Sequence, residues 1–479
     1  MRGWARVGAT AAVGTALAVL PTASQAVGSA PGIRLMTVVG HSTAVRFEGD
    51  PFVYLQPGVY AAATNGPFQL DARRGADGTV AVSYQGTVLR TPQPVQMENG
   101  LPAFFAITVK NARGRSVASV QSDFCPGGWY GQSRVDGSGP DNPTYPYYCG
   151  SSLTRATVWG IDKGWASPLA LGFDGTRVAD GDYTATISIA STYVRQLGLD
   201  PAVSSATFAL TVRTEQWGGC PPDVPCRTAA RTSSPQEAGP LGVTRAESSG
   251  TTGLSGAGQL PNLAALPAHS LFTETDGAGH DYLDFGATMW NAGPGPLVVE
   301  GFRQAATDVM PATQFLYDGS SPAGSASAGQ FEYDRREGHD HWHYEDAAQY
   351  DLLDGTGNRV LLSGKQSFCL APTDPIDLTL PGAEWHPDRQ RLWSSCFGED
   401  AIWLREVMPA GWGDTYFQGV AGQSFDITSL PNATYKLRVT TNPANRILET
   451  RYDDNSAVIS LTLGGSPGAR TVTSSALTR

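Results

Sequence analysis

The feature that most limits the fold of this chain is a recurring series of short runs rich in β-branched and aromatic residues. Runs such as 104–109 (FFAITV) and 183–189 (YTATISI) are separated by Gly, Pro, Asp and Asn. Alternate side chains of an extended strand point to opposite faces, so such runs predict strands joined by turns. No segment has the pattern of a long amphipathic helix. We therefore predict a mainly β protein whose first part is a β-sandwich.

A change in composition at residues 214–258 divides the chain. Pro, Gly, Ser and Thr dominate this stretch, and its apolar residues show almost no periodicity, which is typical of a flexible linker. The β pattern resumes from about residue 260, and the length of 479 residues is sufficient for two domains. The expected organisation is a β-sandwich domain of unknown role at 27–213, a linker at 214–258, a β-rich domain at 259–465 and a flexible tail at 466–479.

The first 26 residues predict a secretory signal peptide. Arg2 and Arg6 accompany an apolar stretch at 7–20, and Ser24 and Ala26 supply small residues at the two positions that cleavage requires. The apolar run is shorter than the ~20 residues that span a bilayer, and no stop-transfer pattern follows it. We therefore expect a secreted protein.

The six cysteines fit an oxidising compartment. They lie in near pairs along the chain, and this proximity predicts three local disulfide bonds, Cys125–Cys149, Cys220–Cys226 and Cys369–Cys396. The loop closed by the first pair is rich in aromatic residues: Trp129, Tyr145, Tyr147 and Tyr148. They could form a binding surface, but we expect them to pack the loop against its own sandwich.

Three of the seven histidines, His339, His341 and His343, occupy alternate positions in the sequence GHDHWH. In an extended strand they share one face, while Trp342 and Tyr344 occupy the other, as core residues would. Three imidazoles on one face can bind a metal and leave open positions for water, oxygen or substrate. Imidazole suits zinc, copper, iron and nickel alike, so these residues do not identify the metal. The alternative interpretation is a polar strand that binds no metal.

The other histidines carry weaker signals. His386 is a candidate accessory ligand, but its Pro-bearing loop favours an exposed surface histidine. Nothing near His41, His269 or His280 indicates metal binding.

Further motifs follow the histidines in a fixed order. They are YDLLD at 350–354, GKQSFC at 364–369, DTY at 414–416, FDIT at 425–428 and ETRYDDN at 449–455. In this combination they resemble the catalytic domain of the lysyl oxidase family over about residues 259–463. The first half of the chain shows nothing of that family. Each motif alone is weak evidence, whereas the ordered series is specific.

The resemblance implies a copper-dependent amine oxidase. Lysyl oxidases make an organic cofactor, lysyl tyrosylquinone, from their own lysine and tyrosine, and the matching positions are Lys365 and Tyr416. The resemblance also identifies copper as the metal of the histidine strand. The two cofactor residues lie far apart in sequence, so they can be cross-linked only after the domain has folded and bound copper.

Amine oxidation requires a base that takes a proton from the α-carbon of the substrate. Asp346, three residues after His343, matches an acidic position of the family pattern, and Glu345 is the nearest competitor. Asp346 would otherwise be a solvated acid or a carboxylate that orients a metal-bound imidazole.

The chain departs from the family pattern at several positions. Animal members carry several disulfides in this domain, whereas only Cys369 and Cys396 are present here. Trp342 replaces a common Tyr, and Gly364 stands where a His precedes the lysine. None of these changes removes a metal ligand or a cofactor residue.

Some family members hold calcium near the C-terminal end. The residues that match this site are Glu449, Asp454, Asn455, Asn262 and Leu263. Arg451, however, replaces an acid, and a cation there argues against calcium because calcium requires hard oxygen ligands. We expect salt bridges from Arg451 to take its place.

The predicted function is therefore a secreted copper- and quinone-dependent amine oxidase that acts on primary amines, with peptidyl lysine as one candidate substrate, and releases an aldehyde, ammonia and hydrogen peroxide. One alternative is a secreted β protein that binds copper or zinc without turnover, which would need neither Lys365 nor Tyr416. Another is an adhesion module built from two sandwiches. The net charge of -11 argues against a nucleic-acid partner.

Overall fold

The computed structural model describes residues 31–127, 131–174, 178–215, 260–303, 308–318, 321–335, 341–363, 367–390, 392–417 and 423–474. The predicted signal peptide, almost all of the predicted linker, and the residues His339 and Lys365 lie outside these ranges. The described part is mainly β, as predicted, with one short α-helix, α1 (Ser191–Gln196). No helix within it is long and apolar enough to cross a membrane.

The strands between residues 32 and 215 form three sheets. One has the order β1 (Gly32–Thr37), β4 (Val59–Thr64), β12 (Trp165–Pro168) and β10 (Ser133–Arg134). The second has the order β11 (Ala156–Ile161), β5 (Phe68–Arg74), β6 (Val80–Tyr84) and β7 (Thr87–Val88). The third has the order β13 (Leu171–Asp174), β3 (Phe52–Leu55), β2 (His41–Phe47), β15 (Ser205–Glu215), β14 (Gly181–Ile189), β8 (Leu101–Asn111) and β9 (Ser116–Phe124). The helix α1 and the 3₁₀ helix η1 (Pro201–Val203) connect β14 to β15.

These three sheets share one hydrophobic core, and together they form what we call the N-terminal domain. In β14 the residues Ala185, Ile187 and Ile189 are buried while their neighbours are partly exposed, which is the alternation that the sequence shows. Pairing extends to residue 215, so Thr214 and Glu215, expected in the linker, are the last residues of β15.

The strands between residues 263 and 474 form three further sheets, which we call the C-terminal domain. One has the order β16 (Leu263–Ala265), β18 (Asp281–Asn291), β27 (Trp412–Tyr416) and β25 (Asp374–Pro375), with β17 (His269–Thr275) and β28 (Ser424–Asp426) also paired to β18. The second has the order β22 (His341–Tyr344), β21 (Ser321–Asp334), β20 (Val309–Asp318), β19 (Leu297–Phe302) and β26 (Trp403–Met408). The third has the order β24 (Arg359–Leu362), β23 (Ala348–Leu353), β29 (Thr434–Thr441), β30 (Ser456–Ser466) and β31 (Ala469–Ser474). A 3₁₀ helix, η3 (Pro387–Gln390), lies in the segment between β25 and β26.

The expectation of a flexible tail from residue 466 is wrong for residues 469–474. They form β31, which pairs with β30, and Val472 packs against the core of the domain. The alternation of Thr471, Val472 and Thr473 is a strand signal that the polar composition of the region obscures.

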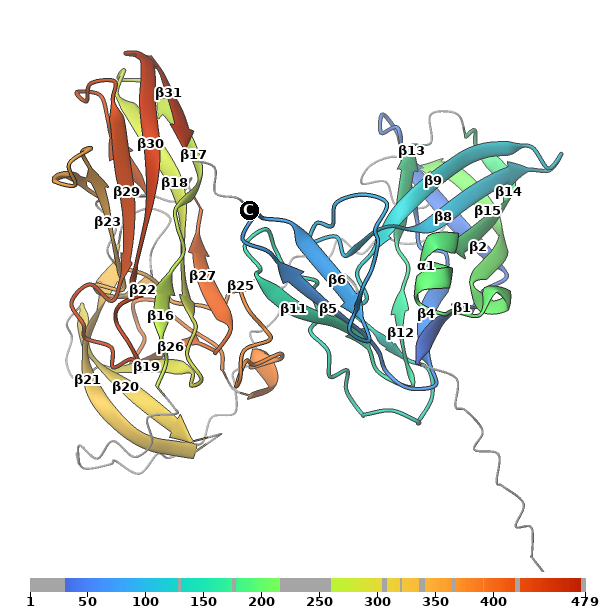
Figure 1. Cartoon of the computed structure of the whole chain (residues 1–479), viewed down its shortest axis with the longest axis horizontal. Helices are drawn as coiled ribbons and strands as arrows, with labels where there is room; N and C mark the ends of the chain where they lie inside the picture. The colour runs from blue at the N-terminus through green and yellow to red at the C-terminus, as the bar shows by residue number, and fades with distance from the viewer. Residues whose placement is uncertain are drawn as a thin grey trace, which may run out of the picture.

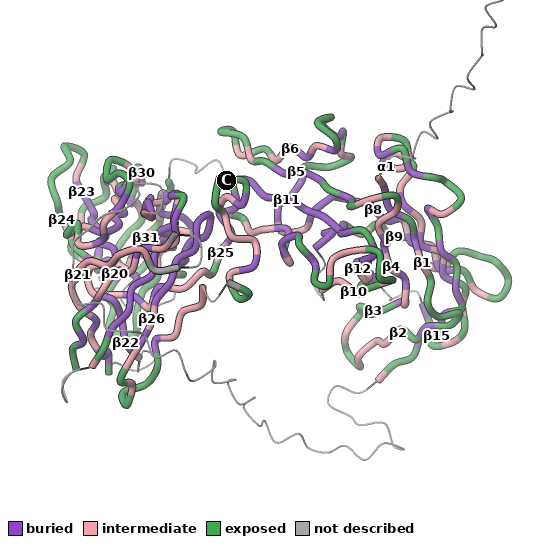
Figure 2. The backbone as a smooth tube through the Cα atoms, turned by 90° about the horizontal axis from the view of Figure 1, so that it is seen from below, coloured by how far each residue is buried: buried purple, intermediate pink, exposed green. Residues whose placement is uncertain are grey.

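Each domain has its own buried core (Figure 2). In the C-terminal domain the core includes Phe331, Trp342, Tyr344 and Phe368, which are at most 1% exposed. Each large apolar side chain removed from water contributes roughly 1.5–3 kcal/mol, so the strand that carries the histidines is firmly held from its apolar face.

Two of the three predicted disulfides are present, Cys125–Cys149 and Cys369–Cys396. The third predicted pair, Cys220 and Cys226, lies outside the described residues.

The two domains contact each other where the segment that follows β25 meets the start of β11 (Figure 1). The expectation that His386 is an exposed surface histidine is wrong: it is 7% exposed, and its Nε2 lies 3.0 Å from the carbonyl oxygen of Thr144 in the N-terminal domain. The Cys-bounded loop packs against its own sandwich, as expected, where the hydroxyl of Tyr145 donates to Gln69 at 3.2 Å, but it also contacts the other domain. Tyr145 and Tyr147 contact Trp385 and His386 of the C-terminal domain.

Candidate metal and cofactor site

The histidine strand β22 is the edge strand of its sheet and pairs with β21. His341 and His343 project from the same face, and their Nε2 atoms lie 2.9 Å apart. Trp342 and Tyr344 are buried on the opposite face, in the arrangement that the alternation predicts. His339, the third predicted ligand, lies outside the described residues.

The separation of the two nitrogens fits a shared metal ion. Metal–imidazole bonds of about 2.0–2.1 Å at a right angle place two ligand nitrogens about 2.9 Å apart. Right-angled nitrogen ligands are typical of Cu(II), whereas a tetrahedral ion would place them farther apart. The same distance also fits a hydrogen bond between two neutral imidazoles, so the geometry permits a metal without requiring one.

Two acidic residues of β21 lie opposite the histidines. Glu332 is the cross-strand partner of His343, and Asp334 is the partner of His341. The carboxylate of Asp334 lies 3.5 Å from Nδ1 of His343, and both side chains are buried. A carboxylate at this nitrogen orients the ring and leaves Nε2 for a metal. Sequence reasoning missed both acids, because the cross-strand register that places them is not visible in the local pattern.

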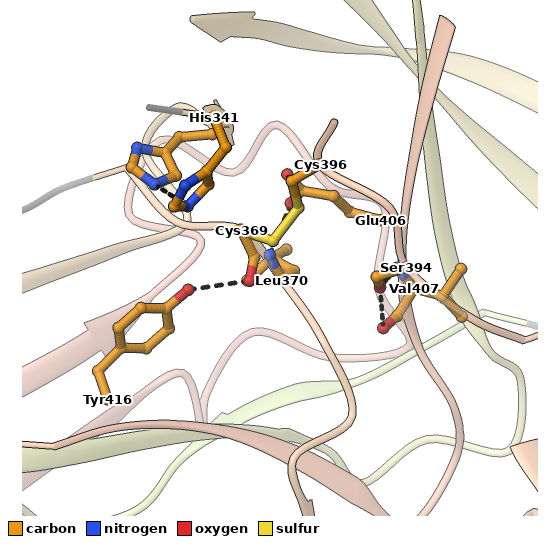
Figure 3. Close-up of a disulfide and its surroundings, with 9 residues drawn as sticks. His341, Cys369, Leu370, Ser394, Cys396, Glu406, Val407 and Tyr416 are labelled. Atoms are coloured by element: carbon orange, nitrogen blue, oxygen red, sulfur yellow. Dashed lines mark hydrogen bonds between the residues drawn. A yellow bond between two sulfur atoms is a disulfide. The ribbon is translucent and has the colours of Figure 1, made fainter. Parts of the chain in front are cut away.

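Tyr416, one of the two predicted cofactor residues, lies at the end of β27, next to the segment that follows Lys365. Its hydroxyl donates a hydrogen bond to the carbonyl oxygen of Cys369 at 2.9 Å (Figure 3). Its ring contacts the ring of Phe368 with centroids 4.6 Å apart. Phe368 in turn forms a β-bridge with Tyr344, the residue after His343.

The segment 367–370 is therefore the physical link between the histidine strand and Tyr416. Ser367 donates a hydrogen bond from Oγ to Glu332 at 2.7 Å, which ties the segment to the face that carries the histidines. Lys365, two residues before Ser367, lies outside the described residues.

Buried acids surround the hydroxyl of Tyr416. Asp414 lies on the same face of β27, and its charge and that of Glu406 act on this hydroxyl. Glu406 lies on the far side of the disulfide from Tyr416 (Figure 3). Burial, followed by the charge of Asp414, raises the pKa of Tyr416 well above its ordinary value, so the phenol stays protonated at neutral pH. Burial also raises the pKa of Glu406 well above its ordinary value, although the backbone N–H of Leu370 donates to this carboxyl at 2.8 Å.

Glu406 also lies beside Cys369 and Cys396, but this group is not a plausible metal site. Both sulfurs are in the disulfide, so neither is available as the thiolate that a metal would require.

Asp346, the predicted base, follows β22 in a turn and has a positive φ of 55°. Its carboxylate pairs with Arg446 at 3.0 Å, and the same guanidinium lies 3.8 Å from Glu345. Glu345 also accepts a hydrogen bond from Gln330 at 2.7 Å. Arg446 thus fixes the position of both candidate acids at the end of the histidine strand.

The residues that match the calcium site of some family members also lie together. Asn262 donates to Asp454 at 2.8 Å, and both Asn442 and Asn455 donate to Glu449, at 2.6 Å and 2.8 Å. Burial raises the pKa of Glu449 to about 6.

Three buried oxygens of this cluster, one each from Asn262, Asp454 and Asn455, have no hydrogen-bond partner among the described residues. Arg451 does not fill the site: it pairs with exposed Asp453 at 2.6 Å and lies 3.7 Å from Asp454. The salt bridges expected of Arg451 are therefore present beside the cluster, and the three oxygens without partners would fit a hard cation such as calcium.

Comparison with known proteins gives matches for the C-terminal part of the chain. Residues 321–473 match the family model for lysyl oxidase. Two relatives, both described as lysyl oxidase homolog 2, from Gallus gallus and Bos taurus, are 32% identical over 119 residues, which is 24% of this chain. The chain spans only 13% of the length of these relatives. The C-terminal region of this chain, at residues 321–473, is a lysyl oxidase domain.

Proposed function

We propose that this chain is a secreted copper-dependent amine oxidase that uses a lysyl tyrosylquinone made from Lys365 and Tyr416. One primary amine, one oxygen and one water would yield one aldehyde, one ammonia and one hydrogen peroxide. A copper ion would be held by His339, His341 and His343 and would supply oxygen activation, while the quinone would supply the electrophile for the amine.

The observation that carries this proposal is the proximity of Tyr416 to the histidine strand through the segment 367–370. A non-catalytic metal protein needs no tyrosine there. Here the hydroxyl of Tyr416 is held by the carbonyl of Cys369, and this segment begins two residues after Lys365. A cross-link between the lysine and the tyrosine would require Lys365, two residues before Ser367, to reach the ring of Tyr416.

The protein's own groups have distinct roles in this proposal. Asp334 fixes the orientation of His343. The carbonyl of Cys369 accepts the hydrogen bond from the Tyr416 hydroxyl, so the ring has one orientation before it is modified. Asp346 takes the α-proton of the substrate, with its position set by Arg446. The substrate class is a primary amine, and peptidyl lysine is one candidate.

The second candidate is a secreted β protein that binds copper or zinc without turnover. The 2.9 Å separation of the His341 and His343 nitrogens supports it equally well, because metal binding alone would produce the same geometry.

The test is tandem mass spectrometry of digests of aerobic protein, with and without copper loading. The proposal expects a peptide that joins Lys365 to Tyr416 only after copper loading, together with hydrogen peroxide release from a primary amine. The variant Tyr416→Phe is the control: it keeps the ring in the core, binds copper like the wild type and forms no cross-linked peptide. Unmodified Lys365 and Tyr416 in fully copper-loaded protein would favour the metal-binding function.

A further inference from the structure

We infer that the N-terminal domain is a positioning partner of the cofactor site: docked on the segment 374–390, it holds the strand that carries Tyr416 in place for cofactor formation. This inference rests on the proposed function for its chemical consequence, and on the domain contacts for its physical basis.

The first contact joins the backbones of the two domains. Strand β11 is an edge strand of its sheet, and Ala156 at its start forms a parallel bridge with Asp377 of the C-terminal domain. The N–H of Arg155 donates to Ile376 at 2.7 Å, and the N–H of Leu378 donates to Ala156 at 2.9 Å. The segment 376–378 thus extends a sheet of the N-terminal domain, which is how extended peptides bind to exposed sheet edges.

The same segment is bound on its other side to the strand of Tyr416. Asp374 and Pro375, which form β25, pair with Gly413 and Trp412 of β27. The N–H of Ile376 donates to Gly411 at 2.8 Å. Residues 374–378 therefore lie between β27 and β11, and each strand satisfies part of their hydrogen bonding.

Thr373 connects this arrangement to Tyr416. Its hydroxyl accepts a hydrogen bond from the N–H of Thr415 at 2.9 Å, and its own N–H donates to Gly413 at 2.9 Å. Tyr416 is the next residue along the chain. A displacement of the segment 373–378 would therefore move the residue directly before the cofactor tyrosine.

An apolar contact supports the backbone pairing. Leu153 packs against a small core cluster of the C-terminal domain that contains Leu266, Trp290 and Ile376. The guanidinium of Arg155 lies 5.5 Å from the centre of a Trp290 ring. The hydroxyl of Thr154, which is fully buried, donates to Pro375 at 2.6 Å.

A second contact uses the Cys-bounded loop of the N-terminal domain. The ring of Tyr145 stacks on Trp385 with centroids 6.0 Å apart. Arg389 donates to the carbonyl of Pro143 at 2.6 Å, and its guanidinium lies 5.3 Å from the ring of Tyr147.

The segment that receives this second contact is itself hydrogen-bonded to β27 and to the residues just before it. Trp412 donates from Nε1 to the carbonyl of Glu384 at 2.6 Å, and the N–H of Glu384 donates to Ala410 at 3.2 Å. The loop that receives Tyr145 and Tyr147 is therefore attached to the same strand as β25.

A two-residue edge strand is a weak support for a reactive side chain when it stands alone. Here β25 has two residues, and the N-terminal domain forms hydrogen bonds with residues 376–378, which directly follow it. Loss of docking would leave residues 374–378 paired on one side only, and the position of Tyr416 would become less defined.

The experiment compares three full-length proteins: wild type, Leu153→Glu and Val88→Glu. Leu153→Glu places a charge in the apolar contact between the domains. Val88→Glu is the matched control. Val88 is 62% exposed on β7, which is the edge strand opposite β11 in the sheet that contacts the C-terminal domain. If Leu153→Glu fails to fold, Arg389→Ala replaces it, since Arg389 is exposed and its loss removes the contacts with Pro143 and Tyr147.

The readouts are copper content, the fraction of Lys365–Tyr416 cross-linked peptide and the hydrogen exchange of residues 374–378 and 412–416. For the docking variant we expect unchanged copper content, at least fivefold less cross-linked peptide and faster exchange in both segments. The control should match the wild type. A normal cross-linked fraction in a docking variant whose segment 374–378 exchanges faster would overturn the inference.

The result for the wild type separates the two proposals. If wild-type protein forms no cross-link, the proposed function fails and the hydrogen exchange of residues 412–416 decides the positioning role alone. Faster exchange in the docking variant would then support that role, and unchanged exchange would overturn it.

Discussion

The carboxylate of Asp334 lies 3.5 Å from Nδ1 of His343, within ion-pair distance and on the side of the ring that faces away from His341. Nδ1 faces the acid, so Nε2 is left to point at Nε2 of His341. The two side chains are 8% and 1% exposed, so little water competes for the contact. Carboxylates in this position fix the ring tautomer and increase the basicity of the ligand.

Replacing this acid should weaken copper binding. We expect Asp334→Asn to lower the copper affinity by about 10–100-fold, the usual cost of losing such a partner. Competition against a chelator of known affinity measures this change. The control is Asp308→Asn, which alters an exposed acid that pairs with Arg335, the residue after β21. Equal affinities for both variants would show that Asp334 does not orient a metal ligand.

The local sequence pattern predicts the strands, and it predicts which side chains of the histidine strand share a face, because alternation is a property of neighbouring residues. It places His341 and His343 together and Trp342 in the core, and the structure confirms this arrangement. It does not reveal Glu332 or Asp334, because their position depends on the register between β21 and β22.

Docking of the two domains is equally absent from the local pattern. The pairing of Ala156 with Asp377 joins residues more than 200 positions apart, and an edge strand carries no signal for its partner. His386 is read as a surface residue for the same reason, since the N-terminal domain buries it.

The role of Asp346 as a base can be separated from that of Glu345 by a pair of variants. We expect Asp346→Asn to lower kcat by about 10²–10⁴-fold, the range for loss of a general base. Glu345→Gln should change kcat less than tenfold, although both acids contact Arg446. The measurement is hydrogen peroxide release from a primary amine at equal copper content and equal cross-linked fraction. A larger loss in the Glu345 variant would reverse the assignment.

The disulfide between Cys369 and Cys396 should stabilise the site segment. It closes a loop with a sequence separation of 27 residues. The chain-entropy relation gives about 3–4 kcal/mol for a loop of this size. We expect the double variant Cys369→Ala, Cys396→Ala to lose stability of this order, measured by chemical denaturation of the purified protein. A loss below about 1 kcal/mol would mean that the β core alone holds residues 367–370.

Calcium should bind at the cluster around Glu449, because three buried oxygens there lack partners among the described residues. We expect calcium to raise the thermal midpoint, since a ligand at 100 times its Kd adds about 2.7 kcal/mol to stability. Asp454→Ala should abolish the increase. Asp453→Ala should preserve it, because Asp453 is exposed and pairs with Arg451. An identical midpoint with calcium and with chelator would show that the cluster binds no calcium.

The contact between the domains should weaken in acid because His386 is buried there. Burial, followed by the charge of Arg389, lowers its pKa below the ordinary value of 6.5, although Asp388 and Glu384 act in the opposite direction. An undocked His386 would therefore bind a proton that the docked form excludes. The free energy of docking is then at its full value above about pH 6.5 and decreases as the pH falls from there to the lowered pKa. Hydrogen exchange of residues 374–378 between pH 7.5 and 5, corrected for the intrinsic rate, measures this loss. In His386→Gln, whose amide can still donate to Thr144 but cannot titrate, the corrected exchange should not depend on pH. The same pH dependence in both proteins would assign the effect to another group.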